Sequence, residues 1–350
     1  MMSVFQIFKI ILGIIISFFI LFIVLTFAGS YSEIGESSRQ VSIMVNFKKS
    51  IDDVYTTGIP TDFEMKDSEI LAYTPPYIRT EVSNVDMDPI PLLLVPGEKF
   101  SVYRNEYDLG WLKFYFIEVL PETNILFVPL GDDERVWSIL GNITKFLPST
   151  ENTETKVKFY VGCNKTDSEW LYPLGERNKF LDYWLPQFVF YDVEMGPCDI
   201  NEEDYEIITI SEDETVDADF LVKPIDGEIG YVYIKDGEDH EEHVYKNGLD
   251  VVALFLGGER YYDYMNEKFL KELEVAINVK TRESDLLMGD TNMWNRCGTE
   301  FLDFKQTLTS IKEDVIPEMD SMDEDDAVEF NYQIKESFRK YKELDSLGCG

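Results

Sequence analysis

The chain has 350 residues, of which 67 are acidic and 31 are basic, and its formal net charge is -36. This acidity excludes nucleic acid as an expected partner, because phosphate recognition needs a basic surface, and it disfavours docking onto anionic lipid headgroups. Hydrophobic residues make up 45% of the chain and aromatic residues 14%, so a folded core is expected rather than disorder.

The first feature of the chain is an uncharged apolar run over residues 10–28. A helix needs about 20 apolar residues to cross a bilayer, so we expect a transmembrane helix here, preceded by a cytoplasmic stub over residues 1–9. The alternative is a cleaved signal peptide, whose apolar core is shorter, at about 7 to 15 residues. Lys9 precedes the run, and Glu33 and Glu36 follow it. The positive-inside rule therefore predicts a single-pass protein of the cell membrane with its N-terminus in the cytoplasm and the rest of the chain outside.

A membrane-proximal segment, residues 29–60, follows the apolar run. It is expected to be helical over residues 31–57 and to stop at Gly58 and Pro60. The side chains predicted to face inward are Ile34, Val41, Val45, Ile51 and Tyr55. Two interpretations stay open. The helix can fold back on its own domain, or it can act as a stalk through which copies self-associate or bind a protein partner.

Residues 61–290 read as an α+β ectodomain, rich in strands with packed helices. The apolar runs that predict strands lie at residues 92–95, 100–104, 111–120, 125–130, 156–161, 188–191, 205–210, 220–222, 229–234 and 251–256. Asp132 is expected to cap a helix through Phe146 that turns Val136, Ile139 and Leu140 inward. A second helix is expected after Gly257, ending near Val279, and a short one at residues 179–185.

Residues 291–350 carry the clearest helical periodicity in the chain. The first apolar stripe comprises Phe301, Phe304, Leu308, Ile311 and Val315, and the second comprises Ala327, Asn331, Ile334, Phe338 and Tyr341. Between them lie Pro317, which cannot continue a helix, and an acidic turn, which favours a new helix N-terminus. The acids at residues 323–326 are therefore interpreted as helix caps, and the two helices as an antiparallel hairpin.

All four cysteines lie beyond the apolar run, and none forms a CxxC pair. Cys297 precedes the first helix of the hairpin and Cys349 follows the second, so both are expected at the same end. A disulfide between them is predicted, which leaves Cys163 to pair with Cys198. The alternative is four reduced, buried thiols.

Two Asn-x-Thr patterns are candidate glycosylation sites in a protein that faces outside. Asn164 lies in a polar stretch next to Cys163 and is the better candidate. Asn142 lies inside a predicted helix and is the poorer one.

The layout of the whole chain resembles that of uncharacterised single-pass membrane-anchored surface proteins of archaea. The features that carry the resemblance are the anchor, the mixed ectodomain, Cys297-Gly298, and Gly348-Cys349 at the C-terminal end. The resemblance implies an extracellular location and no particular activity. The N-terminus differs from that of archaeal pilin precursors, which carry a charged leader with a processing site.

The sequence offers few groups for chemistry. Its two histidines, His240 and His243, lie in an acidic stretch and could bind a metal together with Glu238, Asp239 and Glu242. The competing interpretation is a solvated hairpin tip. No cofactor is expected, although the acidic surface permits a divalent cation.

These observations favour a non-enzymatic surface protein that acts in binding or envelope structure. Two alternatives of a different kind stay open. The first is an anchored, carboxylate-dependent hydrolase of glycans or peptides, because paired acids can act as general acid and base. The second is a subunit of a membrane complex or pilus-like filament, assembled through residues 10–57.

Overall fold

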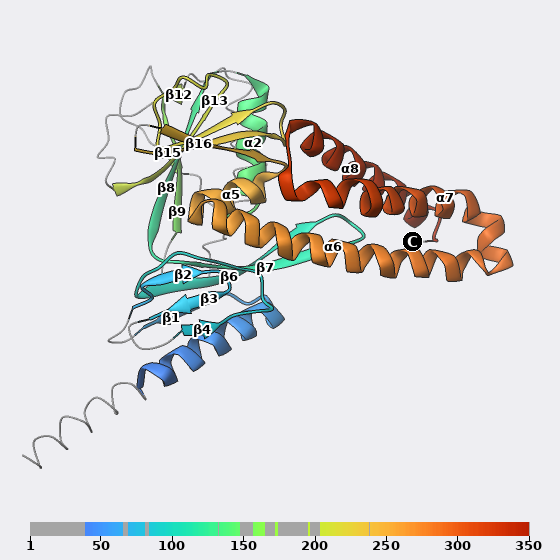
Figure 1. The fold of residues 1–350 in the computed structure, drawn as a ribbon, viewed down its shortest axis with the longest axis horizontal. Coiled ribbons are helices and arrows are strands. Elements are labelled where there is room, and N and C mark those ends of the chain that lie inside the picture. Colours follow the sequence, from blue (N-terminus) through green and yellow to red (C-terminus); the bar gives the residue numbers. More distant parts are fainter. Residues whose placement is uncertain are drawn as a thin grey trace, which may run out of the picture.

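The computed structural model describes residues 39–65, 69–80, 84–131, 133–147, 157–164, 172–173, 195–196, 204–237 and 239–349. The fold is mixed α+β, as the sequence predicts. A body built from sheets carries an arm of long helices that extends away from it (Figure 1). The apolar run at residues 10–28, the predicted elements at 179–185 and 188–191, and Cys198 lie outside the described residues. Within the described ranges, no helix has the length and apolar character needed to span a membrane.

The largest sheet has seven strands in the order β11-β9-β8-β13-β14-β15-β16. Their bounds are Tyr172–Pro173 (β11), Val157–Val161 (β9), Thr123–Leu130 (β8), Glu206–Ser211 (β13), Phe220–Pro224 (β14), Gly230–Asp236 (β15) and Asp239–Tyr245 (β16). Strands β9, β8, β13 and β14 run parallel to one another, and the pairings of β11 with β9, of β14 with β15 and of β15 with β16 are antiparallel. The core strands are apolar on both sides, as parallel strands covered on both faces need to be.

Helix α2, Glu134–Thr144, connects β8 to β9 and packs against the seven-stranded sheet. Its N-cap is Asp133, whose side chain accepts a hydrogen bond from the Arg135 backbone N–H, so the predicted cap at Asp132 was one residue early. The predicted inward face is confirmed. Val136, Ile139, Leu140, Ile143 and Leu147 are all buried.

Within the described residues, the remaining strands form three smaller sheets. The four-stranded sheet has the order β1-β6-β7-β5, with bounds Thr61–Glu64 (β1), Lys99–Asp108 (β6), Lys113–Leu120 (β7) and Leu92–Leu94 (β5). The others are β2-β3-β4, with bounds Ala72–Thr74, Tyr77–Arg79 and Asn84–Asp86, and β10-β12, with bounds Cys163–Asn164 and Met195–Gly196. Central β7 contains the apolar run that predicted a strand buried on both faces, and it is buried from Phe116 to Leu120.

The N-terminal helix spans residues 39–57 of the described chain. It packs against the domain through a stripe at three- and four-residue spacing, formed by Met44, Phe47, Ile51 and Val54. The predicted inward face was right at Ile51 and wrong at Val41 and Val45, which are exposed. The helix carries two apolar stripes, and docking against the sheet decides which of them is buried. This arrangement supports the fold-back interpretation.

The predicted strand at residues 251–256 was also wrong. These residues form helix α5, Gly248–Gly257, capped by Asn247, whose side chain accepts a hydrogen bond from the Asp250 backbone N–H at 3.1 Å. The helix is buried from Gly248 to Leu254. A short apolar run that is buried all round does not reveal its period, so a helix and a strand look alike in sequence.

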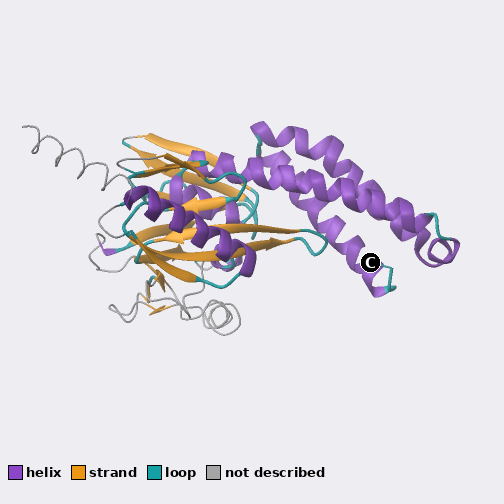
Figure 2. Cartoon of the chain, turned by 90° about the horizontal axis from the view of Figure 1, so that it is seen from below, coloured by secondary structure: helices purple, strands orange, loops and turns teal. Residues whose placement is uncertain are grey.

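The arm consists of three long helices joined by short connections. Their bounds are Glu259–Met288 (α6), Thr291–Ser310 (α7) and Glu324–Ser346 (α8), with a π-helical turn η3, Ile311–Val315, and a 3-10 helix η4, Ile316–Ser321, between α7 and α8. Helix α6 continues nine residues beyond the predicted end at Val279 and packs along α7. Figure 2 shows the arm lying beside the end of the long β6-β7 hairpin.

The antiparallel hairpin and its disulfide are confirmed. Cys297 and Cys349 are bonded, with their Cα atoms 6.6 Å apart. Asp323 and Asp326 form a capping box at the start of α8, in which each side chain accepts a hydrogen bond from the other residue's backbone N–H. The acidic turn therefore caps a helix, as interpreted from the sequence.

The body braces the base of the arm through the tip of the β6-β7 hairpin. The indole N–H of Trp111 donates a hydrogen bond to Ser337 Oγ at 3.0 Å, and its ring lies 6.2 Å from that of Phe304. Near the start of α6, the hydroxyl of Tyr264 donates a hydrogen bond to the carbonyl of Ile90, just before β5, at 3.0 Å. Aromatic side chains with a polar end therefore fix the direction in which the arm leaves the body.

Candidate functional site

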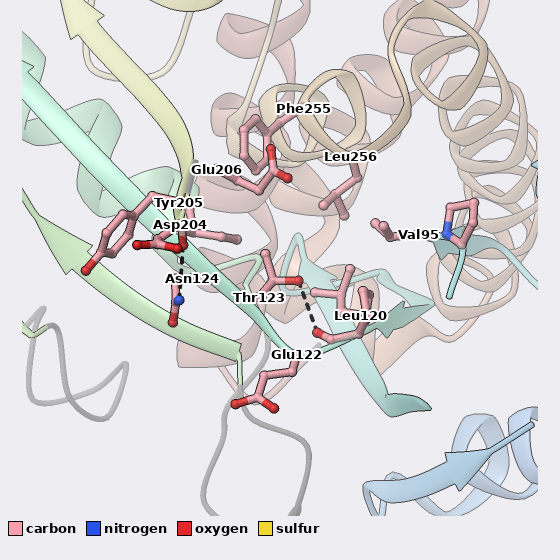
Figure 3. Close-up of a pocket in the computed structure, with 13 residues that line it drawn as sticks. Val95, Leu120, Glu122, Thr123, Asn124, Asp204, Tyr205, Glu206, Phe255 and Leu256 are labelled. Carbon is pink, nitrogen blue, oxygen red and sulfur yellow. Dashed lines mark hydrogen bonds between the residues drawn. The ribbon is translucent and has the colours of Figure 1, made fainter. Parts of the chain in front are cut away.

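A cavity of about 490 Å³ opens at the amino ends of β8 and β13 (Figure 3). Its walls come from the segment after β5, the β7-β8 turn, the start of β13 and the end of α5. Thirteen residues line it: Val95, Pro96, Leu120, Pro121, Glu122, Thr123, Asn124, Ile125, Asp204, Tyr205, Glu206, Phe255 and Leu256. We call this the sheet-edge cavity.

The polar lining of the sheet-edge cavity is acidic. Glu122, Asp204 and Glu206 are exposed at its rim, and the amide of Asn124 donates to the Asp204 backbone carbonyl at 3.1 Å, which ties the two strands together. Lys158 Nζ lies 3.7 Å from a carboxylate oxygen of Glu122. Exposed carboxylates beside an aromatic ring can hold a cation or a polyhydroxylated ligand by hydrogen bonds.

Sequence reasoning missed this cavity because its acids come from distant segments. Glu122 lies in the turn before β8, and Asp204 lies two residues before β13, about 80 positions further along the chain. The parallel pairing of β13 with β8, in which Glu206 lies opposite Ile125, brings them to one edge. Nothing in the spacing of these acids predicts that pairing.

The opposite, carboxyl edge of the parallel strands is where open α/β sheets usually bind ligands. Here it holds an ion-pair cluster. Arg135 contacts both Asp133 and Glu212, and donates to the Ile225 carbonyl at 3.3 Å. The hydrogen bond from the Arg135 backbone N–H to Asp133, supported by the guanidinium, holds the pKa of the Asp133 carboxyl below its usual value. Asp133 therefore caps α2, and Arg135 links this cap to Glu212 and to the Ile225 carbonyl.

A buried charge pair lies where the body meets the arm. The ammonium of Lys246 is 2.8 Å from Asp250 Oδ2 and also donates to the Asn266 side chain, and both charged residues are buried. The Lys246 carbonyl accepts a hydrogen bond from the amide of Asn331 on α8 at 2.8 Å. A pair this completely hydrogen-bonded fixes how α5, α6 and α8 meet, and it is best understood as a structural joint.

The two histidines do not converge. His240 lies opposite Lys235 and His243 opposite Val232 in the β15-β16 pair, and residues three apart on a strand point to opposite faces. His243 is packed against the Tyr262 ring, 3.8 Å from Glu241, and its Nε2 atom is buried. Of the other predicted ligands, Asp239 and Glu242 lie on the same edge strand, and Glu238 is outside the described residues. No group of three or more metal-ligating side chains occurs among the residues that the structure describes.

The predicted glycosylation sites differ in their surroundings. The amide of Asn142 donates to the Gly227 carbonyl, and its oxygen accepts from Lys145 at 2.7 Å, so this side chain already joins α2 to the β14-β15 connection. Asn164 lies in the two-residue strand β10. In the same strand, Cys163 is paired opposite Gly196, two positions before its predicted partner at 198.

The far end of the arm carries exposed apolar side chains from α6, from α7 and from the residue that follows α8. The turn between α6 and α7 and the Cys297–Cys349 bridge lie at this end. Leu286, Trp294 and Leu347, which we call the arm tip, are 79%, 45% and 37% exposed. The sequence analysis missed the tip because it ended α6 near residue 279.

Comparison of the chain with family models, with curated proteins and with solved structures gave no match. The candidate sites therefore stand on their own geometry.

Proposed function

We propose that this chain is a non-enzymatic binding or structural protein of the cell surface. The apolar run at residues 10–28 holds it in the membrane, and the arm presents its tip to a partner in the envelope. The observation that carries the proposal is the arm itself, a set of helices closed by the Cys297–Cys349 disulfide with apolar side chains exposed at its end. Disulfides persist outside the reducing cytosol, which agrees with the flanking charges of the run.

The topology is tested by adding protease to intact cells. The expected result is loss of residues 29–350 while a cytoplasmic marker stays whole, together with recovery of the Cys297–Cys349 peptide pair under non-reducing conditions. Protection of the chain in cells whose surface markers are digested contradicts the orientation.

The role of the tip is tested by replacing Leu286 and Trp294 together with Asp. Both side chains are exposed, so the fold should tolerate the change, whereas a partner that covers them would lose its apolar contacts. The fraction of the protein that stays with the envelope after mild detergent extraction should fall several-fold. The matched control is Val328→Asp, at an exposed valine of α8. Equal retention of both variants contradicts a binding role for the tip.

The sheet-edge cavity supports a second candidate, a carboxylate-dependent hydrolase of glycans or peptides. Its specific support is that Glu122, Asp204, Glu206 and Tyr205 all line this cavity (Figure 3). Under this function, Glu206→Gln should abolish hydrolysis of a glycan or peptide substrate without changing the melting temperature. Absence of turnover by the wild-type chain across both substrate classes leaves the binding role as the better account.

A further inference from the structure

Helix α6 has a second face that the rest of the described chain leaves largely exposed. Its inward face includes Leu273 and Ile277, both buried, whereas Val275 is 62% exposed and Val279 is 57% exposed. At 3.6 residues per turn these two valines point away from the inward face. A shallow apolar cavity of about 440 Å³ lies between this part of α6 and the Trp111-Leu112 turn of the β6-β7 hairpin.

The two valines are flanked by opposite charges on the same stripe. Glu272, Val275, Val279 and Arg282 follow one another at spacings of three, four and three residues, which places them on one face of the helix. Figure 1 shows α6 along one side of the arm, with α7 and α8 on the other side. The stripe is therefore directed away from its own arm.

Among the described residues, neither Glu272 nor Arg282 forms a salt bridge. Neighbouring Lys271 and Lys280, in contrast, each pair with a glutamate one turn away. Glu272 is only partly exposed. Burial raises the pKa of its carboxyl, an effect that Lys268 opposes. A carboxylate in that position would be stabilised by a cation supplied from outside the chain.

The stripe is complementary to itself in the antiparallel direction. Its four members are placed symmetrically about Ile277, with an acid at one end, a base at the other and two valines between. When two copies of α6 pack antiparallel about a two-fold axis at this position, each Glu272 meets the partner copy's Arg282, and each Val275 meets the partner copy's Val279. A two-fold interface requires this self-complementarity, in which residue i contacts j and j contacts i.

We propose that two copies of this chain associate through α6, packed antiparallel about Ile277. The interface joins four valines, closed at both ends by a Glu272–Arg282 pair between copies. The eleven residues from Glu272 to Arg282 cover about 15 Å of helix, so the contact belongs to the weak, concentration-dependent class. Leu286 extends the stripe toward the tip. This contact differs from the self-association through the membrane-proximal helix that the sequence suggested.

The test is sedimentation of the full chain in detergent micelles over a range of concentrations, at about 0.15 M salt, where charges more than about 8 Å apart are screened. The wild-type chain should show a reversible monomer–dimer equilibrium. Val279→Asp places a charge in the centre of the contact and should raise the dissociation constant at least about tenfold, which corresponds to about 1.4 kcal/mol.

Charge reversal separates this contact from association through the apolar run. Glu272→Arg and Arg282→Glu, each alone, place like charges opposite one another in both symmetric contacts and should weaken the dimer by about tenfold or more. The double variant restores opposite charges and should recover wild-type association. Val328→Asp and Glu329→Arg on α8 are matched controls and should leave the equilibrium unchanged.

The proposal is overturned by a chain that stays monomeric at all concentrations, by a dimer that Val279→Asp leaves intact, or by failure of the double reversal to recover association. These outcomes are independent of the proposed surface function, because they are read from the purified chain and not from its orientation in the cell.

Discussion

The body and the arm bury their apolar side chains differently. In the central strand β8, the consecutive residues Ile125, Leu126 and Phe127 are all buried, so both faces of the sheet are covered. In the arm, each helix buries one stripe and leaves the rest in solvent, as Leu273 and Val275 on α6 illustrate. The sheet, covered on both faces, buries enough apolar surface to be stable without a cross-link. The three arm helices each bury only a narrow stripe, so the core that they share is smaller.

The two regions meet at the Lys246–Asp250 pair, and the largest predicted effect is at this joint. Lys246→Met removes the cation and leaves the Asp250 carboxylate buried without it, which should lower the free energy of unfolding by about 3 to 5 kcal/mol. Chemical unfolding followed by tryptophan fluorescence measures the loss. Lys246→Met with Asp250→Asn removes both charges and should recover much of it. A cost under about 1 kcal/mol for the single variant would show that the joint does not couple body and arm.

Removing the disulfide should destabilise the arm and leave the body unchanged. Cys297 and Cys349 are 52 residues apart, and opening a loop of that size should cost about 3 to 4 kcal/mol on the chain-entropy model. We expect the double Cys→Ser variant to show faster amide hydrogen exchange in α7 and α8 than wild type, with the seven-stranded sheet unchanged. Chemical reduction of the wild-type chain is the control and should give the same pattern. Equal acceleration in β8 and β13 would mean that the arm is not a separate unit.

The capping box at the start of α8 should have a smaller effect. Asp323→Ala removes the acceptor for the Asp326 backbone N–H and should cost about 1 kcal/mol. The control is Asp325→Ala, in the same exposed first turn but outside the capping box. Melting temperatures of the two variants measured side by side check the prediction, and an equal loss in both would attribute the effect to helix-end charge instead of the cap.

The smallest predicted effect comes from a surface pair on α8. Hydrogen bonds from Arg339 lower the pKa of the Glu336 carboxyl. Because the folded-state pKa is depressed, the pair stabilises the fold above the unfolded pKa of about 4.5, and this contribution is lost as pH falls through the folded-state pKa. Glu336→Gln should cost about 0.5 kcal/mol at pH 7, since exposed pairs are screened, and nothing at strongly acidic pH. Glu313→Gln, at an exposed acid of η3, is the control. A loss of stability in Glu336→Gln that does not change with pH would contradict an ionic contribution from the Glu336–Arg339 pair.

Local pattern was sufficient where a helix had one apolar stripe and clear ends. The α7-α8 hairpin follows from the stripes at Phe301 and Phe304 and at Ile334 and Phe338, and the pairing of Cys297 with Cys349 follows from the two helices having similar lengths. The strands from β5 to β9 and from β13 to β15 also follow from their apolar runs, because turn residues bound each of them.

Pattern was insufficient where a segment had either two stripes or none. The N-terminal helix offers Val41 and Val45 on one side and Phe47 and Val54 on the other, and only docking selects between them. Residues 251–256 of helix α5 are all apolar, so their periodicity cannot be recognised from the sequence. The end of α6 was placed too early because Val275 and Val279 fall outside the inward stripe.

The sequence by itself determined the acidic surface, the apolar run, the mixed α+β class and the disulfide-closed hairpin, because each depends on composition or on contacts between near neighbours. The tertiary structure alone decided the sheet order, the sheet-edge cavity and the joint at Lys246. These depend on which distant strands and helices meet, as Asn124 meets Asp204 only through the pairing of β8 with β13. The exposure of the Glu272–Arg282 stripe on α6 was also decided there, because it depends on where the other described elements pack.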